Sequence, residues 1–575
     1  MNYAASPVLA LRLPLWRSRL LLVLIAGGFL VLAGRAVYLQ GMNNDFLQQK
    51  GESRYSRVLE ISANRGKITD RQGEALAIST PVKSVWAIPE EVQFSSQQRA
   101  KLAALLEMPP QEIDKRLNDS TSFVYLKRQI PPDAAERVNE LHIPGLFQNR
   151  EYRRYYPGGE VMAHVLGFTG ADDAGQEGVE LAFQSTLAGK SGSRRVIKDR
   201  MGQIVEDMES IREAQNGRDL ALALDAKLQN LAFSQLKLAV ESNKAKAGAI
   251  VVLDAKTGEV LALANLPTYN PNNRSRLSGA QLRNRVITDT FEPGSTLKPF
   301  TVALAIDQGK ITPETMIATA SGSLTIGKAS IHDAHRFGDM SAAQVIQRSS
   351  NVGAARIALS LPAEAMWGMF DQVGFGSLPR MGFPGEVTGR LRAYKSWRPI
   401  EQATMSYGHG ISVSLLQLAR AYTIFARDGE LMPLSLLRVD APLAGKQVIS
   451  PDTARKLRAM LEMAVEVGGT APKARVMGYR VAGKTGTAHK EENGSYAAHK
   501  YVSSFVGLAP VSDPRLVIAV MLDEPSAGQY YGGAVAAPVF SAVMGGALRM
   551  LGVPPDAPLK PLELPPDGSE IKEGV

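Results

Sequence analysis

The chain has 575 residues and a mass of 62.0 kDa, a length that predicts two or three domains. Hydrophobic residues make up 45% and charged residues 21%, which excludes a mostly disordered, collagen-like or multi-span membrane protein. The net charge of +9 is spread thinly, without a Lys- or Arg-rich run, so an anionic lipid or an acidic polymer matches it better than a nucleic acid does. The absence of cysteine excludes disulfides, a thiol nucleophile, Cys-ligated metal centres and a lipoprotein anchor.

An apolar stretch begins at Leu20 and runs to Gly34, and Ala36–Leu39 extend it past Arg35. About 20 residues suffice for a helix to cross the hydrocarbon of a membrane, so we predict a transmembrane helix over 20–39. Three arginines precede it, at positions 12, 17 and 19. By the positive-inside rule, residues 1–19 then lie in the cytoplasm and the chain after residue 39 lies outside. A cleaved signal peptide is the alternative, although Gly34-Arg35-Ala36 is a poor cleavage site.

The region from about residue 42 to 216 is polar, Arg-rich and interrupted by Gly and Pro. Helical patterns occur near Gln97–Leu106 and Pro132–Leu141, between short runs typical of strands. Nothing in this region has the arrangement of a catalytic site. We therefore expect a non-catalytic domain before residue 217.

A different pattern begins at residue 217. Lys227–Ala239 has helical periodicity, and Gly248–Asp254 with Glu259–Ala264 is typical of a β-hairpin. A second pair of strands is predicted far downstream, at Ser503–Leu508 and Leu516–Leu522. We predict an α+β domain, in which both ends of the segment build one antiparallel sheet covered by helices, with a helical subdomain inserted between them. The Pro-rich tail, residues 555–575, is expected to lack a core.

Ser295 follows a Pro-Gly break and opens a helical run, and Lys298 lies one helical turn later on the same face. A lysine accepts a proton from serine only when it is neutral, so we expect a second ammonium and partial burial to lower its pKa. The spacing alone is weak evidence, since it recurs at Ser234–Lys237 inside a helix and at Ser569–Lys572 in the tail. Only Ser295 has a loop-to-helix context.

Two further motifs support Ser295 as the nucleophile. In Ser349-Ser350-Asn351, the Ser349 hydroxyl can relay a proton and Asn351 can hold a substrate amide. Lys484-Thr485-Gly486-Thr487 follows a strand-like run and offers the second cation, hydroxyls for a carboxylate and a glycine that lets a substrate backbone approach. An edge strand here would bind an extended peptide by strand addition. The N–H groups of Ser295 and Thr487 are candidates for an oxyanion hole.

The order Ser-x-x-Lys, Ser-x-Asn, Lys-Thr-Gly is the pattern of penicillin-binding proteins and β-lactamases. The chain resembles class B penicillin-binding proteins, most closely the cell-division type, from the apolar helix to about residue 550. Further segments carry the resemblance: Arg65–Gly73, Arg154–Pro157, Gly167–Gly170, Gly175–Glu180, Phe383–Glu386, Tyr407–Gly410 and Phe505–Pro510.

The resemblance implies a penicillin-binding-protein transpeptidase fold over 217–554, preceded by an elongated pedestal domain of the dimerisation type over 40–216. It implies that Ser295 is acylated, that Lys298 is its base and that Ser349 assists proton transfer. Asn351 would position the substrate, while Lys484, Thr485 and Thr487 would bind the terminal carboxylate of D-Ala-D-Ala.

The implied function is a septal peptidoglycan D,D-transpeptidase without cofactor or metal. The acyl-enzyme would react with an amine of a neighbouring stem peptide, and β-lactam antibiotics would remain attached to the serine. Since no glycosyltransferase domain fits before the pedestal, the implied partners are a division-specific glycan polymerase of the FtsW kind and other divisome membrane proteins. The implied location is the cytoplasmic membrane at the division septum.

Two rival functions share parts of this pattern. A serine β-lactamase or a D,D-carboxypeptidase would pass the acyl group to water, and a non-catalytic sensor or scaffold would only bind β-lactam or peptide. The pedestal, the anchor and the lack of a clear deacylating glutamate argue against a lactamase.

Several charged residues have structural interpretations. Arg65 and Asp70, and Glu177 and Glu180, are expected to form structural salt bridges. The run from His332 to His335 is weak evidence for a metal site, and we expect these residues to have a structural role in a loop instead. His409 is expected to pack locally.

Overall fold

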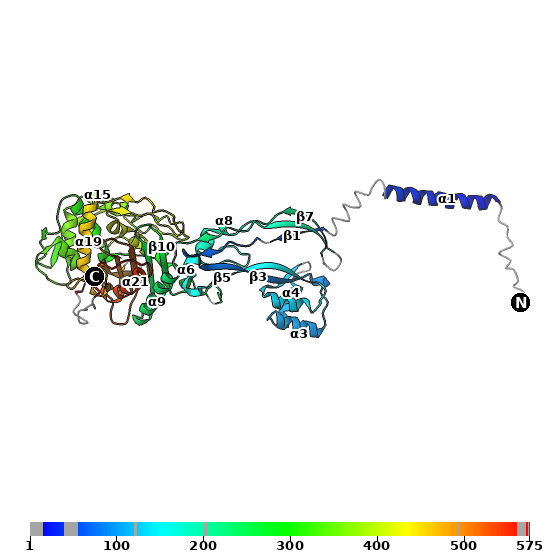
Figure 1. Ribbon diagram of the computed structural model, residues 1–575, viewed down its shortest axis with the longest axis horizontal. Coiled ribbons are helices and arrows are strands. Elements are labelled where there is room, and N and C mark those ends of the chain that lie inside the picture. Colours follow the sequence, from blue (N-terminus) through cyan, green and yellow to red (C-terminus); the bar gives the residue numbers. More distant parts are fainter. Residues whose placement is uncertain are drawn as a thin grey trace. The chain divides into compact units, whose positions relative to one another are not determined.

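The computed structural model describes residues 15–39, 56–61, 63–119, 123–198, 204–275, 277–492, 495–559, 571, 572 and 574. Residues 1–14 of the predicted cytoplasmic segment (1–19) and most of the Pro-rich tail, including Ser569, lie outside these ranges. Figure 1 shows the elements in chain order.

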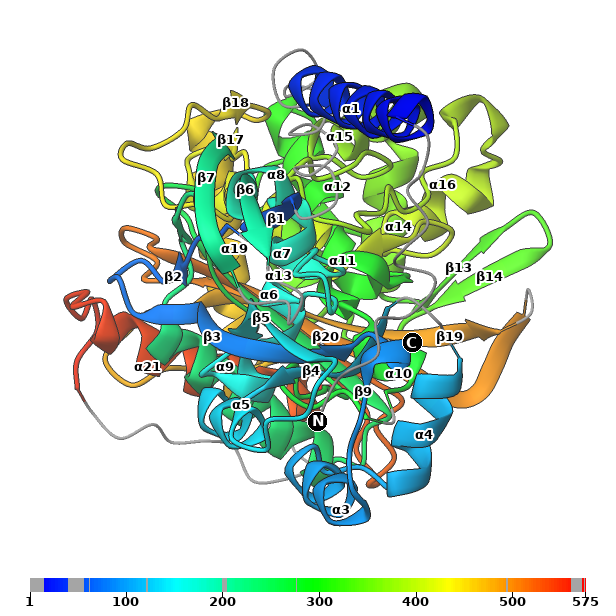
Figure 2. The same cartoon turned by 90° about the vertical axis from the view of Figure 1, so that its right-hand side faces the viewer.

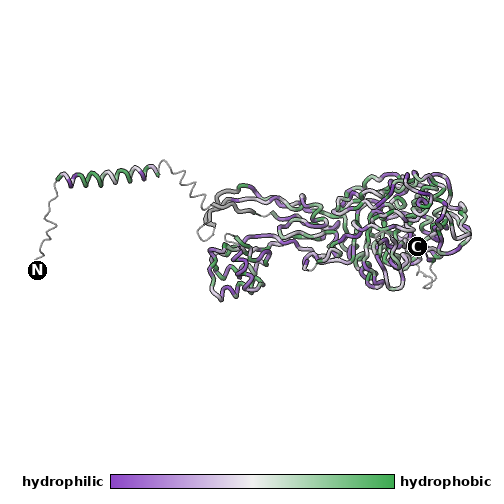
Figure 3. The backbone as a smooth tube through the Cα atoms, turned by 180° about the vertical axis from the view of Figure 1, so that it is seen from behind, coloured by the Kyte–Doolittle hydropathy of each residue, from purple (hydrophilic) through white to green (hydrophobic). Residues whose placement is uncertain are grey.

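Helix α1, Leu15–Val37, contains most of the predicted membrane segment. Its 23 residues extend about 35 Å, enough to cross the hydrocarbon of a membrane once. None of its side chains is buried by the rest of the chain, and Figure 3 shows that apolar residues predominate along it. The helix begins five residues before the predicted span, so Arg17 and Arg19 lie in its first turns. Its retention as a membrane anchor stays a prediction.

The chain divides into two compact units. The first comprises residues 1–63, 81–151 and 190–215, and the second comprises 64–80, 152–189 and 216–575. In the first unit, β1 (Ser56–Ile61), β6 (Gly192–Lys198) and β7 (Ile204–Arg212) form an antiparallel sheet.

A separate small core lies in the first unit. The two expected helices are present as α3 (Ser96–Leu105) and α5 (Pro132–Asn139), and α4 (Pro110–Asn118) was not predicted. Their apolar side chains pack against β3 (Ala75–Ala87) and β4 (Val124–Ile130). Periodicity did not reveal α4 because it buries a single side chain, Ile113.

The second unit is built on a five-stranded antiparallel sheet in the order β10-β9-β21-β20-β19. Its strands are β9 (Ala247–Asp254), β10 (Val260–Leu266), β19 (Ala482–Glu492), β20 (Ser495–Ala509) and β21 (Leu516–Asp523). The predicted hairpin and the predicted downstream strands are therefore neighbours in one sheet, although more than 200 residues separate them in sequence. The predicted α+β class and sheet are confirmed.

Helices cover both faces of this sheet, so β9 and β10 are buried at every position. Ile250 and Val252 of β9 belong to a core with α9 (Ala226–Ser242) and α21 (Ala537–Met550). Val251 and Leu253 belong to the other core, with α12 (Lys298–Asp307), α17 (Leu415–Ala421) and α19 (Pro451–Val465). In Figure 2, α21 and α12 lie on opposite sides of β20. Burial on both faces explains why the strands are continuously apolar.

The insertion between the two halves of the sheet is mostly helical, as predicted, and also contains the hairpin β13 (Ser323–Ile326) and β14 (Ala329–His332). The remaining elements of the described residues are β2 (Ile68–Thr69), η3 (Pro89–Glu91), β5 (Leu146–Tyr155), η4 (Gly159–Val161), α6 (Ala163–Leu166), α7 (Gly178–Ala182), α8 (Gln184–Leu187), β8 (Leu220–Ala221), α10 (Gly279–Leu282), α11 (Arg285–Thr288), β11 (Thr290–Phe291), η5 (Gly294–Leu297), β12 (Met316–Ile317), β15 (Met340–Ser341), α13 (Ala342–Gln347), α14 (Asn351–Leu359), α15 (Ala363–Gln372), η6 (Tyr394–Ser396), α16 (Pro399–Met405), β16 (Val413–Ser414), α18 (Thr423–Ala426), β17 (Glu430–Leu431), β18 (Lys446–Gln447), η7 (Pro472–Ala474) and α20 (Gly532–Val535).

The edge strand expected at the Lys-Thr-Gly motif is present, but its position differs from the strand-like run over Arg480–Ala482 that the sequence indicates. Strand β19 begins at Ala482 and contains the motif. The reason is long-range pairing: Lys484 to Thr487 lie opposite Val506 to Ser503 of β20. Gly483 and Gly486 are paired strand residues.

A buried ion cluster lies within the second unit. Glu180 accepts from Arg65 Nε at 2.6 Å and from Arg154 Nε at 2.7 Å, and all three side chains are almost fully buried. Arg65 thus forms a structural salt bridge, as expected, but with Glu180 and not with Asp70. The Asp70 carboxylate instead accepts the backbone N–H groups of Gln72, Glu74 and Ala226.

Candidate active site

Ser295 lies in the short 3₁₀ helix η5, immediately before α12. Gly294 adopts φ +57°, a conformation that glycine accommodates without strain, and so turns the chain into this helix. Lys298, the first residue of α12, is fully buried, and its Nζ lies 2.8 Å from Ser295 Oγ. The two side chains are therefore in hydrogen-bond contact.

Ser349 contacts the same amine from a different segment. Lys298 Nζ donates to the Ser349 carbonyl oxygen at 2.6 Å and lies 3.0 Å from Ser349 Oγ. Ser349 has φ +60°, an unusual conformation for a residue with a side chain, and such strained positions cluster at functional sites.

Asn351 is the first residue of α14, so the Ser-x-Asn motif joins two helices. Its Nδ2 donates to the His332 carbonyl oxygen at 3.3 Å, while its buried Oδ1 has no hydrogen-bond partner among the described residues. A buried polar atom without a partner is unusual and is available to a substrate N–H.

Asp333 holds this motif in place and was not predicted to do so. Its carboxylate accepts from Ser350 Oγ at 2.7 Å and from the Val352 backbone N–H at 3.0 Å. Asp333 belongs to the run from His332 to His335, which was considered as a metal site, and it caps the N-terminus of α14 instead. Sequence inspection could not assign this role, because Asp333 is 17 residues away from Ser350.

Strand β19 brings the third motif against the serine. A Cβ on Gly486 would lie 2.7 Å from the Pro293 carbonyl oxygen and 2.9 Å from a methyl group of Thr296. Only glycine fits at this distance, so β19 packs directly on the turn that carries Ser295. The free edge of β19 is the outer edge of the sheet.

The side chains of the third motif are buried and interconnected. Lys484 Nζ donates to Thr485 Oγ1 at 3.0 Å, and Thr485 Oγ1 lies 2.9 Å from Thr470 Oγ1. Thr487 Oγ1 accepts the Gly532 N–H at 3.0 Å. The structure thus brings a second lysine to the region of Ser295, through the contact between β19 and η5.

Aromatic residues form one side of the site. The Tyr407 ring centroid lies 5.9 Å from Lys298 Nζ and 5.2 Å from the ring of His409. Burial lowers the pKa of His409 to about 4. His409 is therefore neutral at physiological pH and packs locally, as expected.

The other two Ser-x-x-Lys occurrences differ from this arrangement. Ser234 and Lys237 lie within α9, where Lys237 reaches Glu160 at 3.4 Å in an exposed ion pair. Ser569 lies outside the described residues.

Comparison with known proteins gives two family matches. Residues 248–545 match the penicillin-binding protein transpeptidase domain, and residues 60–222 match the penicillin-binding protein dimerisation domain. The chain is also 42% identical to the peptidoglycan D,D-transpeptidase FtsI of Escherichia coli K12, over 94% of this chain and 93% of the relative. It belongs to the class B penicillin-binding proteins of the FtsI type.

Other relatives of this class B penicillin-binding protein carry the same kind of name. It is 42% identical to the probable peptidoglycan D,D-transpeptidase PenA of Neisseria gonorrhoeae, over 94% of both chains. It is 41% identical to the probable peptidoglycan D,D-transpeptidase PbpC of Pseudomonas aeruginosa, over 94% of this chain and 96% of the relative. Among solved structures, the transpeptidase domain of Burkholderia pseudomallei penicillin-binding protein 3 is 50% identical, with a TM-score of 0.55, and covers 59% of this chain and 98% of its own.

Proposed function

We propose that this class B penicillin-binding protein is a peptidoglycan D,D-transpeptidase that cross-links stem peptides through an acyl-enzyme on Ser295. The observation that carries the proposal is the 2.8 Å contact between Ser295 Oγ and the fully buried amine of Lys298. Burial disfavours a charged amine, and a neutral lysine is the base that a serine nucleophile needs. The names of the relatives support the same reaction.

In the acylation step, Ser295 Oγ attacks the carbonyl carbon of the penultimate D-Ala and its proton passes to Lys298 Nζ. A neutral lysine has two N–H donors and one lone pair, which match the two oxygens of Ser349 and the hydroxyl proton of Ser295. The peptide C–N bond then breaks. The proton moves from Lys298, through Ser349 Oγ, to the leaving nitrogen, and D-Ala departs as a free amine.

The oxyanion of the tetrahedral intermediate is assigned to the backbone N–H groups of Ser295 and Thr487. Ser295 is near the start of η5, where backbone N–H groups lack intrahelical acceptors. Removing one such donor typically costs about 3 kcal/mol of transition-state stabilisation.

Substrate binding is assigned to two further motifs. Lys484, Thr485 and Thr487 bind the terminal carboxylate, and Gly486 permits close approach of the peptide. Asn351 Oδ1, which has no hydrogen-bond partner among the described residues, accepts a donor N–H.

In the second step, an amine of a neighbouring stem peptide attacks the ester carbonyl and gives its proton to the base. A new amide bond forms, Ser295 regains its proton and the cross-link is complete. β-Lactams acylate the same serine and remain attached.

The membrane arrangement completes the proposal. Arg17 and Arg19 at the start of α1 favour a cytoplasmic N-terminus, which places the transpeptidase domain (217–554) and the pedestal (40–216) outside the membrane. The septal location, a glycan polymerase of the FtsW kind and other divisome proteins as partners belong to the same proposal. Midcell fluorescence of a full-length fusion tests the location, and uniform envelope labelling contradicts it.

The deciding experiment labels the detergent-solubilised full-length protein with fluorescent penicillin and maps the adduct by mass spectrometry. We expect it on the fragment that contains Ser295, and we expect Ser295→Ala to remove it. Ser234→Ala, in the other described Ser-x-x-Lys sequence, is the matched control and should retain full labelling. An adduct on another fragment overturns the proposal.

Product analysis separates the rival functions. With a donor peptide and an acceptor amine, a transpeptidase forms the new amide, whereas a D,D-carboxypeptidase only hydrolyses the donor. A β-lactamase loses its acyl group within seconds. A non-catalytic sensor releases no D-Ala.

A further inference from the structure

A part of the tail of the chain lies at the active site. Of residues 571–575, the structure describes Ile571, Lys572 and Gly574. A Cβ on Gly574 would lie 2.7 Å from Asn351 Nδ2 and 3.5 Å from the His332 carbonyl oxygen. Gly574 is therefore in contact with the Ser-x-Asn motif, at the side-chain amide that the proposed function assigns to the substrate.

Lys572 lies towards the third motif. A hydrogen bond with Tyr531 raises the pKa of Tyr530, and the charge of Lys572 opposes this rise, so the ammonium is close to the Tyr530 ring. The Tyr530 carbonyl oxygen accepts from the hydroxyl of Ser503, which is the strand partner of Thr487. The side chain of Lys572 is thus near the end of the Lys-Thr-Gly motif.

The tail therefore crosses the cleft that leads to the serine. Lys572 and Gly574 are two residues apart, a separation of at most about 7 Å along the chain. One of them is near the third motif and the other contacts the second motif. Both motifs border the turn that carries Ser295. A segment that reaches both occupies the space that a donor peptide needs.

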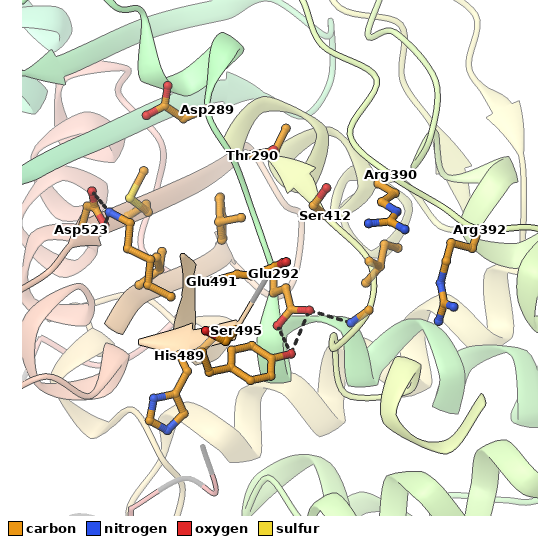
Figure 4. A pocket seen from close by; sticks show the side chains of 18 residues that line it. Asp289, Thr290, Glu292, Arg390, Arg392, Ser412, His489, Glu491, Ser495 and Asp523 are labelled. Atoms are coloured by element: carbon orange, nitrogen blue, oxygen red, sulfur yellow. Dashed lines mark hydrogen bonds and ion pairs between the residues drawn. The ribbon is translucent and has the colours of Figure 1, made fainter. Parts of the chain in front are cut away.

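The tail leaves the neighbouring cavity open. This cavity of about 560 Å³ has Glu292 and His489 in its wall (Figure 4). The His489 ring lies 4.7 Å from the ring of Tyr501, which stacks on Tyr530 at 4.0 Å. None of the described tail residues lines the cavity. The tail contact is therefore in the cleft over the three motifs and not in the cavity.

Burial and charge support this position of the tail. Leu559 is 70% exposed, whereas Ile571 and Gly574 are partly buried, so the tail makes a new contact after it has left the surface. Its residues 563–573 carry four carboxylates and one lysine. The site that they reach contains the buried amine of Lys484 and is assigned to a carboxylate. An acidic segment is attracted to such a site.

We propose that residues 571–574 occupy the substrate cleft of the free protein, and that donor peptides and β-lactams react only after displacing them. The proposal rests on the transpeptidase function given above, because Asn351 is assigned there to the substrate. The tail is tethered, so its effective concentration at the cleft is on the order of millimolar. The rate of acylation is then reduced to the fraction of molecules in which the cleft is empty.

A shortened chain and a replaced tail test this competition. Asp556 accepts the backbone N–H groups of Arg480 and Ser512, so a chain that ends at Leu559 keeps this packing. In a second, full-length variant, residues 571–575 are replaced by Gly-Ser-Gly-Ser-Gly. Both detergent-solubilised variants should react with fluorescent penicillin more than threefold faster than wild type, in second-order rate, at an unchanged melting temperature.

A single substitution tests the contact with Asn351. Gly574→Val places a branched side chain where even a Cβ is only 2.7 Å from Asn351 Nδ2, and should also raise the rate more than threefold. Gly279 supplies the matched control, because it is exposed and a Cβ there meets nothing within 4 Å. Gly279→Val should react at the wild-type rate. Equal rates for these two variants would contradict the contact.

Displacement of the tail can be observed directly, because the chain contains no cysteine. Glu570→Cys provides one attachment site for a fluorescent maleimide, next to the contacting residues. Acylation of Ser295 by ampicillin should lower the fluorescence anisotropy of this label, since a displaced tail rotates more freely. The same label in Ser295→Ala protein should show no change at the same ampicillin concentration.

The outcomes separate this proposal from the proposed function. If penicillin labels Ser295 and the wild-type, shortened and replaced chains react within threefold of one another, the tail proposal is overturned and the transpeptidase proposal stands. A faster shortened chain beside a replaced chain of wild-type rate overturns the assignment to residues 571–574. Unchanged anisotropy on fully acylated protein overturns it as well. A protein that forms no adduct on Ser295 in any of these chains overturns the proposed function itself.

Discussion

The backbone of Ser349 directs both its carbonyl oxygen and its hydroxyl at a single atom, Nζ of Lys298, at 2.6 and 3.0 Å. This is achieved with a left-handed φ of +60°, which costs a non-glycine residue of order 1 kcal/mol or more. The carbonyl oxygen fixes the amine in space, and the hydroxyl provides a path for a proton away from it. The two oxygens therefore have separable functions.

Removing only the hydroxyl tests this separation. Ser349→Ala should lower the second-order rate of penicillin acylation by about 10²-fold, because a positioned proton-transfer group typically contributes 10²–10⁴-fold. Ser349→Gly should lose a similar amount of rate but melt at a higher temperature than Ser349→Ala, since glycine tolerates a positive φ. An acylation rate within threefold of wild type for both variants would exclude Ser349 from proton transfer.

Asp333 is expected to act through the segment it holds. Asp333→Ala removes the acceptor for Ser350 Oγ and for the Val352 N–H, and should destabilise the protein by about 1 kcal/mol, as losing a helix cap does. It should also lower the acylation rate about tenfold by misplacing Asn351. Asp333→Asn keeps one acceptor oxygen and should restore most of the rate. If Asp333→Asn is as slow as Asp333→Ala at equal melting temperature, the positioning role is wrong.

The buried ion cluster predicts a large effect on stability. Glu180→Ala leaves the guanidiniums of Arg65 and Arg154 buried without their anion, which typically costs about 3–5 kcal/mol. This loss is a large part of the free energy of unfolding of a typical domain. The matched control is Glu160→Ala, which breaks an ion pair with Lys237 that is roughly half exposed, and should change the free energy of unfolding by less than about 1 kcal/mol. Urea unfolding of the full-length variants measures both. Equal effects would contradict the prediction.

His164 predicts a pH dependence of stability. Burial lowers the pKa of this histidine from 6.5 to about 4, and its ring hydrogen-bonds the Gln281 carbonyl oxygen at 2.7 Å. Between pH 6.5 and pH 4 the unfolded chain binds a proton that the folded chain does not. Stability is therefore complete above pH 6.5 and falls as the pH decreases towards 4, by about 3 kcal/mol from this residue.

The comparison of wild type with His164→Gln isolates that contribution, because other groups titrate equally in both. Urea unfolding at pH 7, 5.5 and 4 should show a steeper loss for wild type. Parallel curves for the two proteins would show that His164 is not neutral in the folded state.

Local spacing made several features predictable. Ser295 and Lys298 are one helical turn apart, so their proximity follows from helix geometry alone. Continuous apolar runs indicated the buried strands β9 and β21, and an uninterrupted apolar stretch indicated α1. The order of the three motifs indicated the family, which the comparisons confirm, while the catalytic and binding roles of the individual residues stay predictions.

Features that depend on long-range contacts could not be predicted from the spacing of residues in the sequence. The pairing of β19 with β20 placed the Lys-Thr-Gly motif inside a strand, beyond the strand-like run that the sequence indicates. Arg65 bound Glu180 instead of nearby Asp70 because two segments 115 residues apart pack together and exclude water. The sequence by itself determined which chemical groups are available and which of them share one helical turn. Only the tertiary structure decided which distant groups meet and the conformation of Ser349, because burial selects among partners that are equivalent in the unfolded chain.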